Sequence, residues 1–148
     1  MRRAAAAIAL ATLVACRPNP RNEIAEIAGV AMEEVARTAQ GRPLCVDRVI
    51  APWQEASASR RVDPPAPPGY GDLYAAGTFR GGGGIKGDAI GGVRVGTSAA
   101  CFDLRGPLVK DERAMIEVHH ADIGFNVWQR RTDGVWRVAA VTTSVYAR

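Results

Sequence analysis

The sequence predicts an α+β fold, in which one N-terminal helix packs on a curved antiparallel β-sheet of meander type. Three observations predict it. Apolar residues recur at helical spacing over residues 23–40, apolar and polar residues alternate from residue 98 to the C-terminus, and prolines and glycines form an irregular middle between these regions. Because an amphipathic helix must bury its apolar stripe, a sheet face is its simplest partner.

The helix is expected over residues 23–40. Asn22 is a favourable N-cap, and Glu23 lies in the first turn, where the helix dipole favours negative charge. Gly41 followed by Pro43 is a stop signal. The apolar stripe consists of Ile24, Ile27, Ala31 and Val35, widened by Ala28 and Val30.

The middle of the chain contains one expected strand, residues 44–50, and two segments that disfavour regular structure. Residues 63–69 hold four prolines, which remove hydrogen-bond donors and fix φ, so we expect a stiff surface connection. Residues 81–96 hold eight of the 16 glycines, and we expect a mobile loop or a loosely paired hairpin there. The spacing of Gly82, Gly84 and Gly87 matches a dinucleotide fingerprint, but the glycines that follow exclude the helix it requires.

The C-terminal part is expected to form four consecutive strands: residues 98–104, 113–121, 123–131 and 135–146. Gly106 and Pro107 should break the first strand, and Asp133-Gly134 should form the turn of the last hairpin. By simple alternation, Trp136, Val138 and Ala140 share one face of the final strand.

The first 15 residues have the layout of a secretory signal peptide. Arg2 and Arg3 precede an uncharged, mostly apolar run that ends in small residues, and Cys16 follows directly. The sequence Leu-Val-Ala-Cys at this point resembles the lipobox of small proteobacterial lipoproteins. That resemblance implies that the Cys16 thiol takes a diacylglyceryl group, that the signal is cut before it, and that the new amine is acylated. The alternative is a plain cleaved signal peptide.

The lipobox resemblance gives the expected organisation and location. Residues 1–15 form the signal, residues 16–21 the lipidated cysteine and its tether, and residues 22–148 a single α+β domain. The apolar run of twelve residues is shorter than the roughly 20 that span a membrane, so we expect the acyl chains to be the anchor. The protein is then expected at the periplasmic face of the cell envelope. Arg17 after the cysteine, rather than Asp, favours the outer membrane in the enteric pattern.

The charge of the chain belongs partly to its export signal. Removing Arg2 and Arg3 changes 19 basic against 15 acidic residues to 17 against 15, which lowers the net charge from +4 to +2. The remaining charges alternate in sign along the chain. Nucleic-acid binding is therefore not expected, because it requires clustered positive charge.

Cys45 and Cys101 are the two cysteines left after lipidation, and we expect them to be bridged in an oxidising compartment. Two buried free thiols are one alternative. A Cys₂Asp₂ metal site is another, because Asp47 and Asp103 each follow a cysteine by two residues and would share its strand face. No C-x-x-C spacing supports that site, so no metal or cofactor is expected.

His119 and His120 are the only histidines and the weak candidates for catalysis, together with Glu117. Adjacent strand residues point to opposite faces, so the histidines should not chelate one metal. Glu117 shares a face with His119 and could form a general acid–base couple with it. The alternative is a pair of polar residues on a solvated sheet face.

The ending from Trp128 to Val138 resembles the terminal hairpin of nuclear-transport-factor-like and cystatin-like cone folds, in which an N-terminal helix packs into a curved antiparallel sheet. The Pro- and Gly-rich middle departs from that family, whose members have helices there. The resemblance implies a pocket between helix and sheet, whose apolar lining, more typical of a core than of a ligand site, would be Ile24, Ile27, Phe125 and Trp136.

Three functions remain open. The first is a non-enzymatic, lipid-anchored binding or interaction module with an unidentified envelope protein as partner. The second is a cone-fold hydrolase or isomerase, which requires His119 or His120 in a cavity beside a carboxylate. The third is a carrier of a small apolar ligand, which requires a vacant pocket of several hundred cubic ångströms, on the order of known ligand sites.

Overall fold

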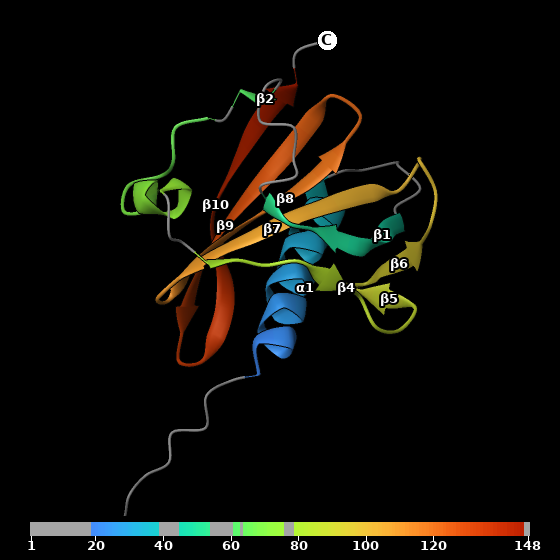
Figure 1. Ribbon diagram of the computed structural model, residues 1–148, viewed down its shortest axis with the longest axis horizontal. Helices are drawn as coiled ribbons and strands as arrows, with labels where there is room; N and C mark the ends of the chain where they lie inside the picture. Colours follow the sequence, from blue (N-terminus) through green and yellow to red (C-terminus); the bar gives the residue numbers. More distant parts are fainter. Residues whose placement is uncertain (1–18, 39–44, 54–60, 63, 76–78, 147–148) are drawn as a thin grey trace, which may run out of the picture.

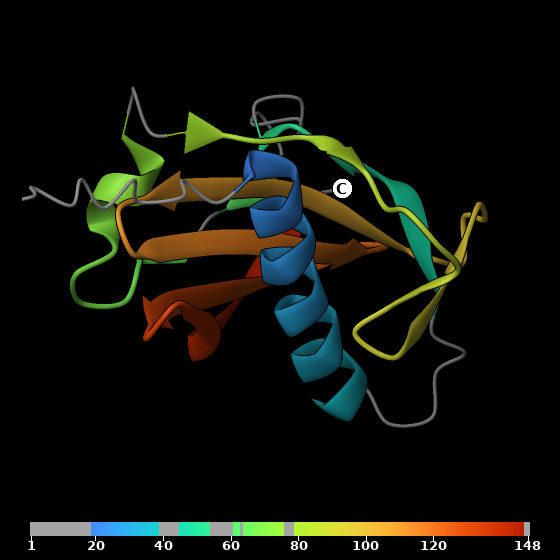
Figure 2. The ribbon, with the colours of Figure 1, turned by 90° about the horizontal axis from the view of Figure 1, so that it is seen from below.

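In the part of the chain that the structure describes there is one α-helix, α1 (Pro20–Thr38), which lies across one face of a strongly curved β-sheet (Figures 1 and 2). The structure is a computed structural model, and it describes residues 19–38, 45–53, 61–62, 64–75 and 79–146. The predicted α+β class is confirmed. The predicted signal peptide and Cys16 lie outside the described residues. None of the helices within these ranges is both long and apolar enough to span a membrane.

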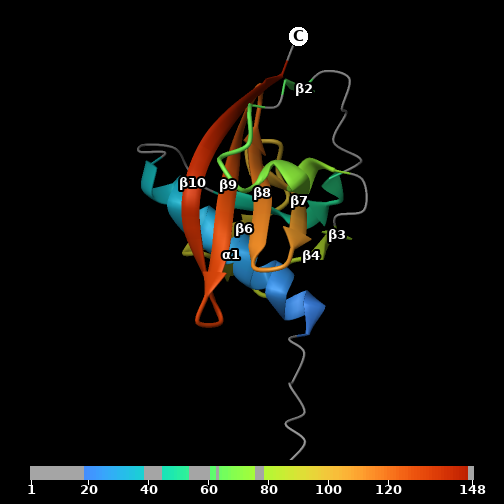
Figure 3. The same ribbon diagram turned by 90° about the vertical axis from the view of Figure 1, so that its left-hand side faces the viewer.

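The described residues form one sheet with the strand order β2-β10-β9-β8-β7-β1-β6-β5, while β3 pairs with β7 and β4 with β1. The strands are β1 (Cys45–Ala51), β2 (Arg61–Val62), β3 (Phe79–Arg80), β4 (Gly83–Gly84), β5 (Ala89–Ile90), β6 (Val93–Gly96), β7 (Phe102–Lys110), β8 (Arg113–His120), β9 (Ile123–Thr132) and β10 (Val135–Tyr146). Strands β7 to β10 form the antiparallel meander that the alternating pattern predicts, as Figure 3 shows.

The sheet is mixed, so the expectation of a purely antiparallel sheet is wrong. Strand β1 lies between β6 and β7 and runs parallel to both. A parallel pair requires a long crossover connection, and the chain between Ala51 and Phe102 is long enough to provide it. The parallel half of the sheet is therefore built by the irregular middle of the chain.

The helix begins at Pro20 rather than at Glu23, and Asn22 lies inside its first turn rather than at the cap. The carbonyl oxygen of Asn19 accepts hydrogen bonds from the backbone N–H groups of Asn22 and Glu23, at 2.9 and 3.2 Å. Proline is tolerated at the first helical position because the N–H there has no partner within the helix. The helix therefore includes the last two residues of the predicted tether, 20 and 21.

The β7–β8 and β9–β10 pairings contain irregularities that the sequence pattern did not predict. Gly106 and Pro107 lie inside β7 instead of ending it, since the pairing with β8 shifts between Arg105 and Leu108. The pairing of β10 with β9 shifts between Val138 and Ala140. An extra residue of this kind reverses the inside–outside alternation beyond it. Trp136 therefore faces α1, whereas Ala140 packs on the opposite side of the sheet.

The domain has a hydrophobic cluster on each face of the sheet. The larger cluster lies between α1 and the sheet and includes the whole predicted helical stripe. The smaller one lies on the other face, where the 3₁₀ turn η2 (Gly71–Tyr74) contacts β7 and the ring of Tyr74 packs against that of Trp128 in β9. Its buried members are Trp53, Tyr70, Leu73, Leu108, Met115 and Trp128. The proline-rich segment therefore leads into a second core, which was not predicted.

Candidate functional site

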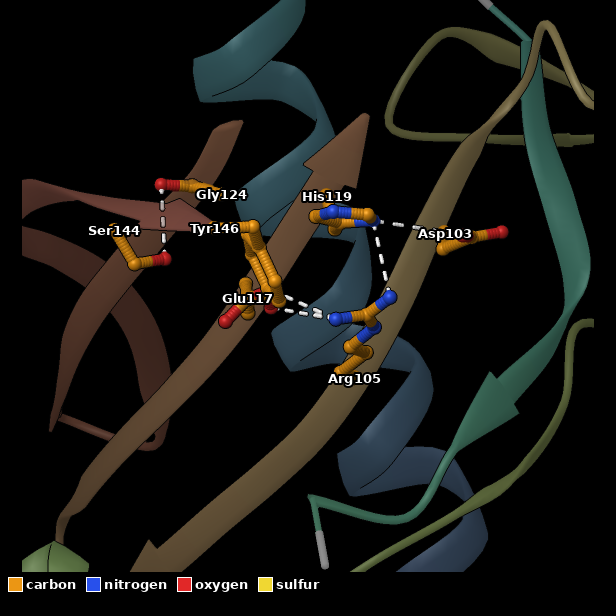
Figure 4. A network of polar contacts seen from close by, with 7 residues as sticks. All are labelled: Asp103, Arg105, Glu117, His119, Gly124, Ser144 and Tyr146. Carbon is orange, nitrogen blue, oxygen red and sulfur yellow. Dashed lines mark hydrogen bonds and ion pairs between the residues drawn. The ribbon is translucent and has the colours of Figure 1, made fainter. Parts of the chain in front are cut away.

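Five polar residues gather on the sheet face opposite α1, and we call them the Arg105 cluster: Asp103, Arg105, Glu117, His119 and Tyr146 (Figure 4). They come from β7, β8 and β10. Register brings Arg105 opposite Glu117, and Asp103 opposite His119, on the neighbouring antiparallel strands. Side chains at such positions lie close together on one face.

The carboxylate of Glu117 is fully buried and contacts two groups of the cluster. Its Oε1 accepts a hydrogen bond from the Tyr146 hydroxyl and lies 3.5 Å from Nη1 of Arg105. The same Nη1 donates to the Tyr146 hydroxyl oxygen at 2.5 Å. Arg105, Tyr146 and Glu117 therefore form a closed triangle, in which the guanidinium compensates a carboxylate that would be costly to bury alone.

Gly124 provides the space that the buried carboxylate occupies. A Cβ at this position would lie 2.8 Å from the carboxylate carbon of Glu117 and 2.5 Å from Oγ of Ser144. The Ser144 hydroxyl donates to the Gly124 carbonyl at 3.4 Å, beside the cluster in Figure 4. Only a residue without a side chain fits beneath Glu117.

His119 is almost fully buried, and its Nδ1 lies between two groups of opposite charge. Nη2 of Arg105 is 3.1 Å away and Oδ2 of Asp103 is 3.6 Å away. A histidine ring nitrogen accepts or donates according to its tautomer, so Nδ1 can accept from Arg105 or donate to Asp103. The interaction with His119, and then the charge of Arg105, lowers the pKa of the Asp103 carboxyl from its usual value.

The cluster brings two of the three catalytic candidates together and separates the third. Glu117 and His119 share a face, as predicted, but Glu117 Oε1 contacts Arg105 and Tyr146. The Glu117 carboxylate is therefore bound by Arg105 and Tyr146, and the carboxylate beside His119 is that of Asp103. His120 points to the other face, where its ring lies 5.5 Å from that of Phe102.

A groove of about 880 Å³ lies at the start of α1, away from the Arg105 cluster. Its walls come from the first two turns of α1, from β1, from the glycine-rich segment and from β5. The lining residues are Asn19, Asn22, Ile24, Ala25, Arg48, Ile50, Gly82, Gly83, Gly84, Ile85, Lys86, Ala89 and Ile90. Its volume is within the roughly 300–1,000 Å³ that is typical of small-molecule sites. The groove is partly open, not enclosed.

The glycine-rich wall of the groove is held in place by hydrogen bonds and close packing. Nη1 of Arg48 donates to the carbonyls of Ile85 and Gly87, at 2.9 and 3.0 Å, and the Arg48 carbonyl accepts from Ile85 N–H at 2.8 Å. At the β5–β6 turn, a Cβ on Gly91 would lie 2.3 Å from the carbonyl oxygen of Gly29 in α1. The segment is therefore a paired hairpin docked on the helix.

The sequence anticipated this groove at one residue only. Ile24 lines the groove, whereas Ile27 and Trp136 are buried in the larger core and Phe125 packs against it. The remaining lining could not be deduced from periodicity, because the glycine-rich segment has none. Arg105 and Tyr146 were missed for a related reason, since only the strand register brings them to Glu117.

The predicted disulfide between Cys45 and Cys101 is confirmed, with an S–S distance of 2.07 Å. It joins β1 to the residue just before β7 and lies beside Gly96, whose Cβ would be 3.1 Å from Sγ of Cys101. The bond excludes the alternatives of free thiols and of a Cys₂Asp₂ metal site at these two residues.

No protein family, curated protein or solved structure matches this chain in the comparisons. The function is therefore inferred from the fold, from the Arg105 cluster and from the groove at the start of α1.

Proposed function

We propose that the protein is a lipid-anchored binding module of the bacterial cell envelope, held at the periplasmic face through Cys16 and binding its ligand in the groove at the start of α1. The observation that carries this proposal is the groove of about 880 Å³, which no described side chain fills. Its apolar floor and polar rim have the composition of a small-ligand site.

The groove lies close in sequence to the proposed lipid anchor, which supports a binding site at the membrane surface. Asn19 lines the groove and follows Cys16 by three residues. Three residues span at most about 10 Å even when fully extended. A lipid on Cys16 would therefore hold the groove close to the membrane surface.

The anchor is tested with Cys16→Ser in the full-length protein expressed in a Gram-negative host. We expect the wild type in the membrane fraction and labelled with radioactive palmitate, and the variant released and unlabelled. The matched control is Cys45→Ser with Cys101→Ser, which removes the other two cysteines but should leave the protein membrane-bound. A Cys16→Ser variant that stays in the membrane fraction would refute the lipid anchor.

A His-based enzyme is the second candidate, favoured by the burial of His119 beside Asp103 and Arg105. Under this proposal His119 would be the base of a hydrolase or isomerase. It requires turnover by the purified protein, for example of p-nitrophenyl esters, that His119→Ala abolishes and His120→Ala leaves intact. Equal activity of both variants and the wild type would refute it.

A further inference from the structure

The groove at the start of α1 combines an aliphatic floor with a positive rim. Six lining residues are aliphatic: Ile24, Ala25, Ile50, Ile85, Ala89 and Ile90. No aromatic ring and no carboxylate is present among the described lining residues. Such a surface fits a flexible hydrocarbon chain, because flat ring systems usually bind against aromatic side chains.

Two cations line the groove, and they differ in their contacts with the glycine-rich wall. The Arg48 guanidinium already donates to the carbonyls of Ile85 and Gly87. The ammonium of Lys86 is exposed, and it has no ion-pair partner among the residues that the structure describes. An anionic group placed beside Lys86 would therefore meet an ammonium that no carboxylate already pairs among the described residues.

We propose that this groove binds an anionic phospholipid of the membrane to which the protein is anchored, with an acyl chain on the isoleucine floor and the phosphate at Lys86. The proposal rests on the proposed anchoring, because the short link from Cys16 to Asn19 places the groove at the lipid surface. Burial of the methylene groups of the chain against the isoleucines would drive binding.

The protein's own lipid is the competing occupant, since it too carries acyl chains within reach of the groove. A diacylglyceryl group on Cys16 has no phosphate, however, and would leave Lys86 without an anion. The charge at the rim therefore favours a separate phospholipid over the acyl chains of the anchor.

The test uses the full-length protein, purified from membranes and reconstituted into vesicles of phosphatidylethanolamine and phosphatidylglycerol. A small fraction of the phosphatidylglycerol carries a diazirine on one acyl chain, and peptide mass spectrometry locates the adducts after irradiation. We expect adducts on residues 24–25 and 85–90. Ala25→Trp and Ala89→Trp fill the groove and should remove most of them, whereas Ala99→Trp, at an exposed alanine outside the groove, should not.

Charge recognition is tested with Lys86→Gln, an exchange at an exposed residue that should not disturb the fold. Loss of about 1 kcal/mol of attraction to an anionic lipid predicts an adduct yield roughly fivefold lower with diazirine phosphatidylglycerol. The yield with diazirine phosphatidylcholine should not change. Arg137→Gln, at an exposed arginine on β10, is the control and should behave as wild type in both cases.

Three outcomes would overturn the inference. One is a set of adducts confined to peptides outside the groove. Another is equal labelling of the groove by phosphatidylcholine and phosphatidylglycerol in the wild type. The third is labelling of the groove by a diazirine fatty acid incorporated at Cys16, which would make the anchor its own occupant. Membrane retention is scored separately with Cys16→Ser, so failure of the lipid site is distinguishable from failure of the anchor.

Discussion

The buried ion pair of the Arg105 cluster makes a quantitative prediction about stability. Glu117 is 0% exposed, and Arg105, whose side chain is 17% exposed, lies 3.5 Å from its Oε1. Removing one partner of a buried pair costs about 3–5 kcal/mol, because the other charge remains buried without compensation. Since water can reach part of the Arg105 site, we expect Arg105→Ala to lower the free energy of unfolding by about 3 kcal/mol.

A double-mutant cycle separates this charge effect from the loss of arginine packing. In the Glu117→Gln background there is no carboxylate to leave uncompensated, so Arg105→Ala should cost only about 1 kcal/mol, and the coupling energy should be about 2 kcal/mol. For a domain of about 130 residues the single variant should also melt roughly 12 °C lower, at about 4 °C per kcal/mol.

The assay is urea unfolding of the purified full-length protein with its disulfide intact, followed by tryptophan fluorescence and extrapolated linearly to water. Circular dichroism at room temperature verifies that each variant is folded before its stability is compared. A coupling energy below about 0.5 kcal/mol would show that Arg105 and Glu117 act independently, and would refute the account of the cluster given above.

Three further predictions concern other parts of the structure. Replacing the Cys45–Cys101 disulfide by two serines should cost about 4 kcal/mol of unfolding free energy, since it closes a long loop, and a loss below about 1 kcal/mol would contradict this. Gly124→Ala should lower the free energy of unfolding in urea by about 2 kcal/mol, because the added methyl group overlaps Ser144 and Glu117. The control is Gly71→Ala, whose methyl group meets no atom within 4 Å and should leave the stability unchanged. The hydrogen bond from Arg113, followed by that from Lys110, lowers the pKa of Asp72 to about 2. Its stabilising contribution should thus be complete above pH 3.8 and be lost as the pH falls toward 2, and a carboxyl NMR titration that is unchanged in Arg113→Ala would contradict this origin.

The meander could be predicted because its information is local. Each strand alternates apolar and polar residues, and Asp133 and Gly134 both adopt the positive φ that a tight hairpin turn requires. The bulges in β7 and β10 could not be predicted in this way, since one extra residue leaves the composition of a strand unchanged and only alters which face each side chain meets. The bulge in β10 is the reason why simple alternation predicts the wrong face for Ala140.

Only one part of the Arg105 cluster, the pair of Glu117 and His119, could be predicted from the sequence. The spacing of Glu117 and His119 places them on one face of a strand whatever the rest of the sheet does. The partners Arg105 and Tyr146 lie on other strands, and the position of Arg105 opposite Glu117 depends on where the β7 bulge falls. A sequence pattern within one strand cannot contain that information, so the residue that compensates the buried charge becomes visible only with the register.

The glycine-rich segment forms a paired hairpin, one of the two structures that its composition predicted. Many glycines suggest mobility, because glycine has the widest conformational freedom. Here Gly91 has a φ of 54° and faces the backbone of α1 so closely that any side chain would collide with the Gly29 carbonyl. Two Arg48 hydrogen bonds fix the adjoining loop against β1. The glycines therefore allow backbone to pack on backbone, and this close approach places Ile85, Lys86 and Ile90 along one side of a groove whose other side is the beginning of α1.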